Sequence, residues 1–155
     1  MNPGELTSVY FIGIGGIGMS AIARYFNTRG VAVAGYDKTE TALTQQLNAE
    51  GIRVYYSEDL DVLPENIDLV VYTPAVPADH QQLVHLLNLG VPVMKRAQVL
   101  GLISQSQKTI AIAGTHGKTT TSSMVTHVLK SCDEPVSAFL GGILSGYNTN
   151  YFLGD

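Results

Sequence analysis

Residues 9–23 read VYFIGIGGIGMSAIA, and they give the strongest indication of the fold class. A short apolar run, 9–14, leads into closely spaced glycines, and small and apolar residues of helical character follow them. Gly13, Gly15 and Gly18 match the pattern G-x-G-x-x-G, with an additional glycine at position 16. A strand, a glycine-rich turn and a helix in this order are typical of a β–α–β unit that binds a nucleotide-type ligand.

Each glycine of this first loop has an expected role. Gly13 permits the tight turn, Gly15 lets a pyrophosphate approach the backbone, and Gly18 lets the helix pack on its strand. The free N–H groups at the start of the helix then point at an anion. Asp37 ends the next apolar run, where an acid binds a ribose hydroxyl. The alternative is a turn that serves packing only, with Asp37 capping the following helix.

The same alternation continues as far as residue 105. Apolar runs at 31–37, 52–56, 68–72 and 91–94 predict strands, and residues 39–49, 79–89 and 95–104 predict helices, with Asp79 as an N-cap. Gly30, Gly51 and Gly90 stand where helices end. Near-continuous apolar strands alternating with helices indicate an α/β fold, a parallel sheet covered on both faces. We therefore expect a Rossmann-like domain over residues 1–105.

A second segment begins after the polar joint SQSQK. Residues 109–114 predict a strand, 117–131 a helix and 135–142 another strand, followed by a polar tail with aromatic residues at 142–155. A single β–α–β unit cannot bury both of its faces. We therefore expect residues 106–155 to be the start of a second domain, of the P-loop ATPase type, and the sequence to be a fragment that ends inside it.

Composition excludes several classes of protein. The formal net charge is −4 and the pI is about 5.4, so no basic stripe favours nucleic acid. The single cysteine, Cys132, allows no internal disulfide, which fits a reducing compartment. The first residues show no signal peptide, and no apolar run is long enough to span a membrane. We expect a cytoplasmic location with no membrane partner, and the oligomeric state stays open.

A second glycine loop lies in AIAGTHGKTTTSSM, residues 111–124. The common phosphate-binding spacing, G-x-x-x-x-G-K-[ST], would need a glycine where Ile112 stands. The rest of the pattern is intact, since Lys118 can contact the β- and γ-phosphates and Thr119 can bind Mg²⁺. Thr120 can donate to a further phosphate oxygen. The alternative is a threonine-rich helix start with Thr115 as its N-cap.

The first loop alone would fit an NAD(P)-dependent oxidoreductase. The second loop has no role in hydride transfer, however, and residues 1–105 show no acid–base pair for that reaction. His80 and His85 fall in the predicted helix 79–89, where we expect both to face solvent.

With its two glycine loops in this order, the chain resembles the Mur ligases of peptidoglycan synthesis over its whole length. The resemblance rests on GIGGIGMSAIA, VVYTPAVPAD, VPVMKRAQVLG and AGTHGKTTT in that order. The family's second loop reads G-T-x-G-K-[ST]-[ST], which accounts for the missing glycine. The resemblance implies an ATP-dependent amide ligase that joins L-alanine to UDP-N-acetylmuramate through an acyl phosphate. A recycling ligase of the same superfamily, which adds a preformed peptide to this sugar nucleotide, is the alternative.

The resemblance also implies the site residues. Those expected to meet the UDP-sugar are Gly13, Gly15, Gly16, Ile17, Gly18, Asp37, Thr73, Pro74, Ala75, Arg96, Gly141 and Gly142. Those expected to hold ATP are Gly114, Thr115, His116, Gly117, Lys118, Thr119 and Thr120, with Lys118 as the catalytic cation and Thr119 on Mg²⁺. Arg96 has a plain alternative as a solvated cation at a helix start. The family's acidic metal-binding segment, adenine contacts and amino-acid-binding domain are expected beyond Asp155, so we expect this chain alone to bind UDP ligands without turnover.

Overall fold

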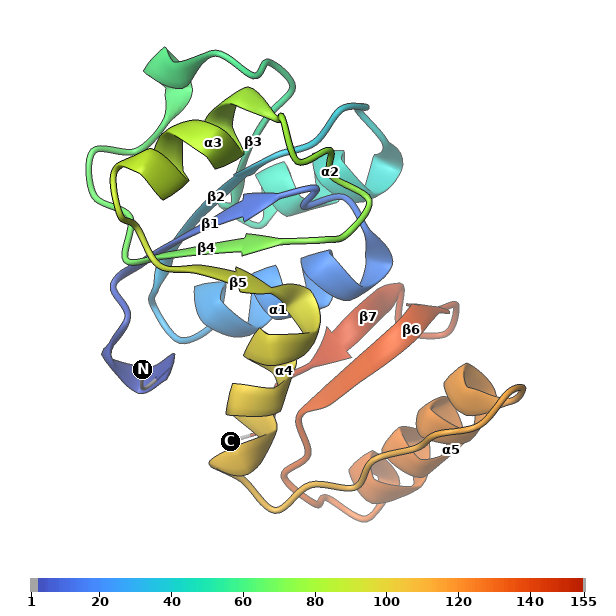
Figure 1. Ribbon diagram of the computed structural model, residues 1–155. Coiled ribbons are helices and arrows are strands. Elements are labelled where there is room, and N and C mark those ends of the chain that lie inside the picture. Colours follow the sequence, from blue (N-terminus) through green and yellow to red (C-terminus); the bar gives the residue numbers. More distant parts are fainter. Residues whose placement is uncertain (1–2, 155) are drawn as a thin grey trace.

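A computed structural model describes residues 3–154 and shows a parallel sheet with helices on both faces (Figure 1). The strands are β1 (Ser8–Ile12), β2 (Ala32–Tyr36), β3 (Arg53–Tyr55), β4 (Leu69–Tyr72) and β5 (Val93–Lys95). Their order in the sheet is β3-β2-β1-β4-β5, and each neighbouring pair is parallel. The chain therefore reverses its direction of travel across the sheet between β1 and β4. The predicted α/β fold is confirmed for this part.

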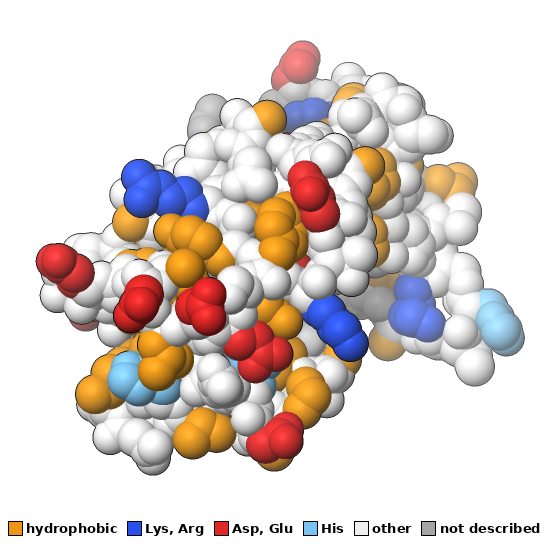
Figure 2. Space-filling model, turned by 90° about the horizontal axis from the view of Figure 1, so that it is seen from above, with side chains coloured by type: hydrophobic (Ala, Val, Ile, Leu, Met, Phe, Trp, Pro, Cys, Tyr) orange, Lys and Arg blue, Asp and Glu red, His pale blue; other side chains and the backbone are white. Residues whose placement is uncertain are grey.

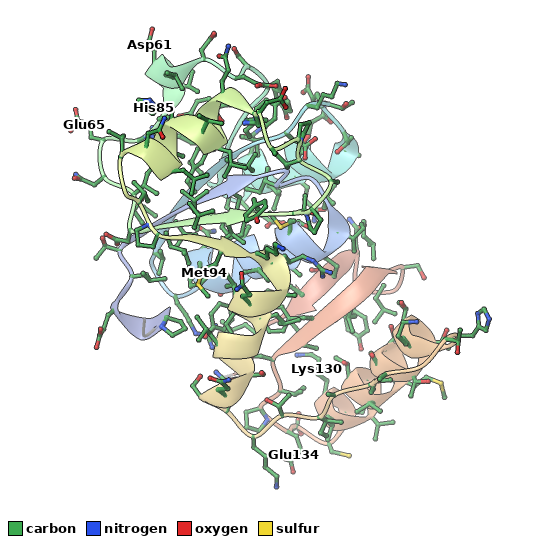
Figure 3. All side chains as sticks on the ribbon, in the orientation of Figure 1. Asp61, Glu65, His85, Met94, Lys130 and Glu134 are labelled. Atoms are coloured by element: carbon green, nitrogen blue, oxygen red, sulfur yellow. The ribbon has the colours of Figure 1, made fainter. Side chains whose placement is uncertain are left out.

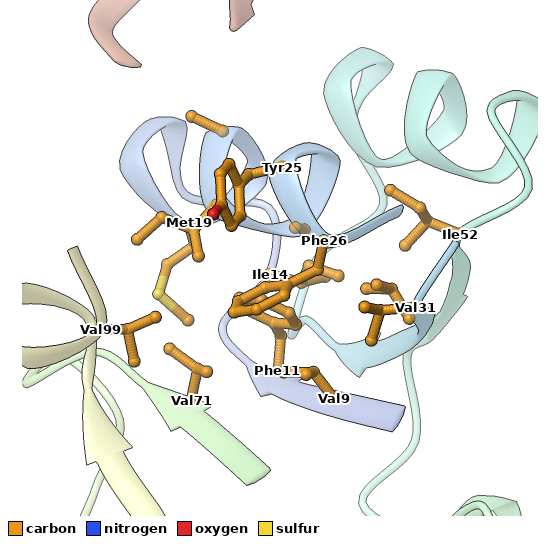
Figure 4. Packing of buried hydrophobic residues seen from close by; sticks show 14 of the residues in the cluster. Val9, Phe11, Ile14, Met19, Tyr25, Phe26, Val31, Ile52, Val71 and Val99 are labelled. Atoms are coloured by element: carbon orange, nitrogen blue, oxygen red, sulfur yellow. The ribbon is translucent and has the colours of Figure 1, made fainter. Parts of the chain in front are cut away.

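Four helices cover the sheet: α1 (Ile17–Asn27), α2 (Ala42–Ala49), α3 (Gln81–Asn88) and α4 (Arg96–Gln105). Two single 3₁₀ turns, η1 (Pro3–Glu5) and η2 (Leu60–Val62), complete this part. Side chains of α1 and α4 pack with Phe11 and Val71 on one face (Figure 4), and α3 packs on Tyr10 and Val70 on the other. Alternate residues of each strand thus face two separate apolar layers.

Helix ends follow the sequence signals at some positions and not at others. Gly30, Gly51 and Gly90 have φ of 78°, 87° and 74°, the left-handed conformation predicted for glycines that close helices. The predicted N-cap Asp79 is wrong, and so is the alternative in which Asp37 caps the following helix. The N-cap of α2 is Thr41, which forms a reciprocal capping box, so Asp37 does not cap this helix. The residue before α3 is His80 and not Asp79.

The predicted strand 109–114 is wrong, because no described strand lies beside it to complete a ladder of hydrogen bonds. These residues run mostly exposed into α5 (Lys118–Ser131). The next strand, β6 (Ala138–Leu144), begins later than predicted, and the supposed tail supplies β7 (Thr149–Phe152), its antiparallel partner. Residues 106–154 thus form a helix and a hairpin in place of the predicted strand–helix–strand unit.

The hairpin packs against the outer side of α1 (Figure 1). The ring of Tyr25 lies 5.6 Å from that of Phe139 and 6.4 Å from that of Tyr151, measured between centroids. Helix α1 is consequently buried on both sides, which explains why every residue from Met19 to Phe26 is buried.

A buried polar network ties the hairpin to α1. The amide of Asn150, a fully buried residue, donates to the Ile17 carbonyl and to Ser20 Oγ, and its oxygen accepts from Arg24. Arg24 also forms a bidentate pair with Glu50, at 2.7 and 2.9 Å. A buried guanidinium is stable only when its charge and donors are matched in this way.

Candidate functional site

A cavity of about 460 Å³ opens at the carboxyl ends of the strands, where the strand order reverses between β1 and β4. Ligands of open α/β sheets bind at such a reversal point, because the loops on either side diverge there. Each loop at this edge contributes to the lining: Gly13, Gly16, Gly18, Met19, Tyr36, Asp37, Lys38, Glu58, Thr73, Ala75, Val76, Pro77, His80 and Arg96.

The first glycine loop forms one wall of this cavity. The N–H groups of Gly13 and Ile14 both donate to the Tyr36 carbonyl, at 2.8 and 3.0 Å, which holds the turn against β2. Gly13 has φ of 85°, and a Cβ there would lie only 2.9 Å from Thr73 Cγ2. No side chain caps the start of α1 at Gly16, so its first N–H groups remain available to an anion.

Arg96, the first residue of α4, places its guanidinium directly over Gly18. A Cβ built on Gly18 would overlap Nη1 of Arg96, and the three atoms nearest to it all belong to this side chain. The close approach at Gly18 is therefore to Arg96 and not, as predicted, to the preceding strand. The guanidinium and the uncapped start of α1 together give this part of the cavity a positive potential that suits an anion.

Asp37, at the end of β2, holds the glycine loop in place. Its Oδ2 accepts from the Gly15 N–H at 2.7 Å, and its Oδ1 accepts from the Thr39 N–H at 3.2 Å. The carboxylate fills the space that a side chain at Gly15 would occupy, since a Cβ there would lie 2.8 Å from Oδ2. Asp37 also lines the cavity, so the carboxylate that shapes the loop is at the same time accessible from the cavity.

Three further polar side chains line the cavity, Tyr36, Glu58 and His80, none of which was predicted as a site residue. The Tyr36 hydroxyl donates to Glu58 Oε1 at 3.4 Å. Burial, followed by the neighbouring charge of Glu58, raises the pKa of Tyr36, so the phenol stays protonated. Glu58 follows β3, and the rule that ligands meet the carboxyl ends of parallel strands could have found it.

The prediction that His80 faces solvent is wrong. Its side chain is 3% exposed and lies edge-on to Tyr36, with 4.7 Å between ring centroids. Neither ring nitrogen has a hydrogen-bond partner in residues 3–154, and Nε2 stays 3.8 Å from the nearer oxygen of Glu58. An unsatisfied buried polar group costs about 1–3 kcal/mol. His85, by contrast, is partly exposed on α3.

Of the other predicted UDP-sugar residues, some line the first cavity and some a second one, whereas Pro74 and Gly142 line neither. Thr73 and Ala75 line the first cavity, while Pro74 is exposed in the turn between them. Ile17 and Gly141 line a second cavity of about 310 Å³, enclosed by α1, α4 and β6. Gly18 and Arg96 line both cavities, so the two cavities are adjacent at this pair of residues.

The second glycine loop lies beside this second cavity. A Cβ on Gly141 would lie 3.0 Å from Thr119 Oγ1, and one on Gly142 would lie 3.3 Å from Thr119 Cγ2. The glycines of β6 thus allow α5 to approach closely. Residues 114–120 are all exposed.

Lys118 folds back over its own loop. Its ammonium donates to the carbonyls of Gly114 and Thr115, at 2.6 and 3.2 Å. Gly117, with φ of 76°, is the N-cap of α5 and supplies no side chain, so the alternative of Thr115 as N-cap is wrong. The uncapped helix start and the lysine form a second place where phosphate groups fit.

Residues 3–154 contain neither a cluster of metal ligands nor a membrane-spanning helix. No three His, Cys, Asp or Glu side chains gather closely enough to hold a metal ion. No helix in this range has the length and apolar character needed to cross a bilayer.

Comparison with known proteins identifies relatives. UDP-N-acetylmuramate–L-alanine ligase of Porphyromonas gingivalis is 52% identical over 152 residues, covering 95% of this chain and 33% of that protein. The same ligase of Flavobacterium johnsoniae is 47% identical over 154 residues, covering 97% and 34%. The chain therefore spans about a third of the length of the curated relatives that it matches.

Two of the solved structures that match this chain are also ligases named for UDP-N-acetylmuramate. The crystal structure of UDP-N-acetylmuramate–alanine ligase MurC from Thermotoga maritima matches with a TM-score of 0.88 at 37% identity, covering 95% of this chain and 35% of that one. The UDP-N-acetylmuramate:L-alanyl-gamma-D-glutamyl-meso-diaminopimelate ligase from Neisseria meningitides matches with a TM-score of 0.85 at 31% identity, covering 96% and 47%.

A family model described as "Mur ligase family, catalytic domain" matches residues 8–108, the range that holds the whole parallel sheet and the glycine loop at its reversal point. On this match, the chain belongs to the Mur ligase family.

Proposed function

We propose that the chain carries the nucleotide-binding part of an ATP-dependent ligase that joins L-alanine to UDP-N-acetylmuramate in peptidoglycan synthesis. The observation that carries the proposal is the first cavity, whose lining combines Arg96 and the uncapped start of α1 with Asp37 at the end of β2, groups that suit the pyrophosphate and the ribose of one ligand. Relatives with this activity are about 50% identical along nearly the whole chain, which supports the same assignment.

In this proposal the two cavities hold successive parts of the sugar nucleotide. Arg96 and the start of α1 bind the pyrophosphate, and Asp37 lies toward the ribose. The second cavity, which Arg96 also lines, then receives the sugar and leads to Gly141, next to Thr119. The carboxylate of the muramyl group would in this way be directed toward the second glycine loop.

The second loop fits the triphosphate of ATP. Lys118 would turn from the carbonyls of Gly114 and Thr115 to phosphate oxygens, and the first N–H groups of α5 would bind further oxygens. Thr119 would offer its hydroxyl to Mg²⁺, with carboxylate ligands coming from outside the described residues. ATP supplies the phosphoryl group that activates the substrate carboxylate as an acyl phosphate.

The proposal keeps residues 1–105 as the UDP-sugar-binding domain and residues 106–155 as the start of the ATP-binding domain, in a cytoplasmic enzyme. A recycling ligase that adds a peptide to the same sugar nucleotide is the second candidate. Among the solved structures, the identity is 37% to the L-alanine ligase of Thermotoga and 31% to the Neisseria peptide ligase, which favours the first.

Isothermal titration of the chain with UDP-N-acetylmuramate, UDP and NAD tests the proposal. We expect both UDP ligands to bind and NAD not to bind. Arg96→Ala should weaken UDP binding between about tenfold and a hundredfold, because it removes a charge-assisted hydrogen bond. Arg53→Ala, an exposed change on β3, is the matched control. Binding of NAD without binding of UDP would overturn the proposal in favour of an oxidoreductase.

A further inference from the structure

Asn150 on β7 is a buried polar residue that lines neither cavity, yet it contacts the start of α1. Its side-chain amide donates to the Ile17 carbonyl and to Ser20 Oγ. Asn150 and Ile17 are 133 positions apart in the sequence, and Asn150 lies beyond the range 8–108 that the family model matches. The hairpin therefore reaches the end of α1 at which the diphosphate of the ligand is proposed to bind.

The contact at Ile17 bears on the ligand through one peptide unit. The Ile17 carbonyl and the Gly18 N–H belong to the same planar, trans peptide, so a donor that fixes the direction of the carbonyl also fixes that of the N–H. Gly18 is the second residue of α1, and its N–H has no hydrogen-bond partner within residues 3–154. Since Gly18 lines both cavities, Asn150 orients an N–H group that faces the place proposed for the ligand.

The surroundings of Asn150 hold its amide in one orientation. Arg24 donates to the Asn150 oxygen, and because a guanidinium has no acceptor, the amide must turn its N–H groups toward Ile17 and Ser20. The Ser20 hydroxyl also donates to the Ile17 carbonyl, at 2.9 Å. Hydrogen bonds to a carbonyl polarise the peptide and strengthen its N–H as a donor, by roughly 10–30% per bond.

Oriented donors matter in this chain because its overall charge repels an anion. The formal net charge is −4. Figure 2 shows Asp and Glu side chains on several parts of the face seen from above, and no broad patch of Lys and Arg on that face. The affinity for a diphosphate must therefore come from local groups, which are Arg96 and the first N–H groups of α1.

We propose that Asn150 is a positioning residue for the diphosphate of the ligand, acting through the Ile17 carbonyl to orient the Gly18 N–H. The inference rests on the proposed function, which places a diphosphate at the start of α1. By linkage, a diphosphate that binds the Gly18 N–H also strengthens the bond between Asn150 and Ile17. The hairpin thus contributes to the affinity of a site that it does not touch.

Titration of the 155-residue chain with UDP and with inorganic pyrophosphate tests the proposal. Asn150→Ala should weaken the binding of both about fivefold, because both carry the diphosphate and the effect is that of about one hydrogen bond. Ser20→Ala should weaken both by less, since the Asn150 donor to Ile17 remains.

Tyr151→Leu and Lys130→Gln are the matched controls. Tyr151 follows Asn150 on β7 and packs on Tyr25, with 6.4 Å between ring centroids, and Lys130 on α5 lies 5.4 Å from the Phe152 ring centroid (Figure 3). Both side chains contact the elements around the hairpin, and neither lines a cavity. Tyr151→Leu should lower the free energy of unfolding, and both variants should keep the wild-type affinities.

Nuclear magnetic resonance gives a readout that a loss of stability alone does not move. The Gly18 amide resonance depends on the hydrogen bonds at the Ile17 carbonyl, since both atoms belong to one peptide. Without ligand, it should shift in Asn150→Ala and stay near its wild-type position in Tyr151→Leu. In the wild type, UDP should shift the Gly18 amide and, with it, the side-chain NH₂ resonances of buried Asn150.

The outcomes separate the two proposals. If the wild type does not bind UDP, the proposed function fails, and this inference fails with it. If it binds UDP and Asn150→Ala binds UDP equally tightly, only the inference is overturned. An equal loss of affinity in Asn150→Ala and Tyr151→Leu also overturns it, because the cause would then be a loosened hairpin. Should Asn150→Ala not fold, wild-type Asn150 NH₂ resonances that stay in place while UDP shifts the Gly18 amide overturn it without any variant.

Discussion

The guanidinium of Arg96 lies where the side chain of residue 18 would stand, so the glycine in α1 and the arginine at the start of α4 occupy one shared space. The two residues are far apart in the sequence and meet only because α1 and α4 pack on the same face of the sheet. This pairing brings a cation to the uncapped start of α1 and lets Arg96 line both cavities.

Gly18→Ala should separate ligand affinity from stability. Alanine favours a helix by up to about 1 kcal/mol over glycine, so the free energy of unfolding should stay unchanged or rise. The new methyl group displaces the guanidinium, and UDP binding should weaken about tenfold. Urea unfolding and calorimetry measure the two effects.

Gly30→Ala is the control for this change. Gly30 has φ of 78° and open space around it, so alanine there costs about 1–2 kcal/mol of stability through backbone strain. It should leave UDP affinity unchanged. A Gly18→Ala protein that binds UDP as tightly as the wild type would contradict the role given to Arg96.

Asn150→Ala should loosen the hairpin from α1. The change removes both donors to Ile17 and Ser20 and leaves Arg24 with an unmatched N–H. We expect the free energy of unfolding to fall by about 1–3 kcal/mol, the cost of buried groups left unsatisfied. Asn88→Ala, an exposed change on α3, should stay within about 0.5 kcal/mol of the wild type. Equal unfolding curves for the two variants would show that the network contributes nothing.

Asp68 should make stability depend on acid pH. Its Oδ2 accepts from the Thr7 N–H, the Thr7 hydroxyl and the Ser8 N–H, at 2.7, 2.8 and 3.0 Å, and these bonds lower the pKa of the carboxyl. A lowered folded-state pKa contributes stability above the unfolded value, about 3.9, and that stability is lost as the pH falls through the folded value.

Urea unfolding at pH 6, 4.5 and 3 checks this dependence. From pH 6 to pH 3, the wild type should lose more stability than Asp68→Asn, because only the wild type has this carboxylate to protonate. Asp61→Asn, an exposed change in η2, should keep the wild-type dependence. A pH profile of Asp68→Asn that parallels the wild type would refute the assignment.

The 155-residue chain by itself should bind UDP-N-acetylmuramate without turnover. It spans about a third of its curated relatives, and residues 3–154 contain no carboxylate cluster that would hold Mg²⁺ beside Thr119. A phosphate-release assay with UDP-N-acetylmuramate, ATP and L-alanine should therefore give the no-enzyme rate, while the full-length Porphyromonas relative serves as the positive control. Phosphate release at the rate of the positive control would contradict the prediction.

Local sequence signals were sufficient to predict the parallel sheet and much of the lining of the first cavity. The glycine loop and Asp37 could be predicted because one β–α–β unit contains them. The helix ends at Gly30, Gly51 and Gly90 could be predicted because the sequence signal for a helix end lies within a few residues of it. Residues 109–114 have the composition of a strand, but a strand also requires a partner, and composition does not say where one lies.

His80 and Asn150 show the opposite case. His80 is buried only because the loop carrying Glu58 folds over the start of α3, and Asn150 only because the hairpin returns to α1. Both depend on contacts between distant segments, which periodicity does not encode. One sequence signal for the burial of α1 was available. The run AIARYF has few polar residues on any face of a helix, which predicts a helix that is buried on all of its faces.

The double-sided burial of α1 sets a limit on how the chain can be shortened. A protein cut after residue 105 would keep the whole parallel sheet yet lose the cover that Phe139 and Tyr151 give to Tyr25, and would leave Arg24 with Glu50 alone. The newly bared aromatic and aliphatic surface would favour self-association. A boundary at residue 105, which the number of strands suggests, would therefore not give a nucleotide-binding unit that stays monomeric in solution.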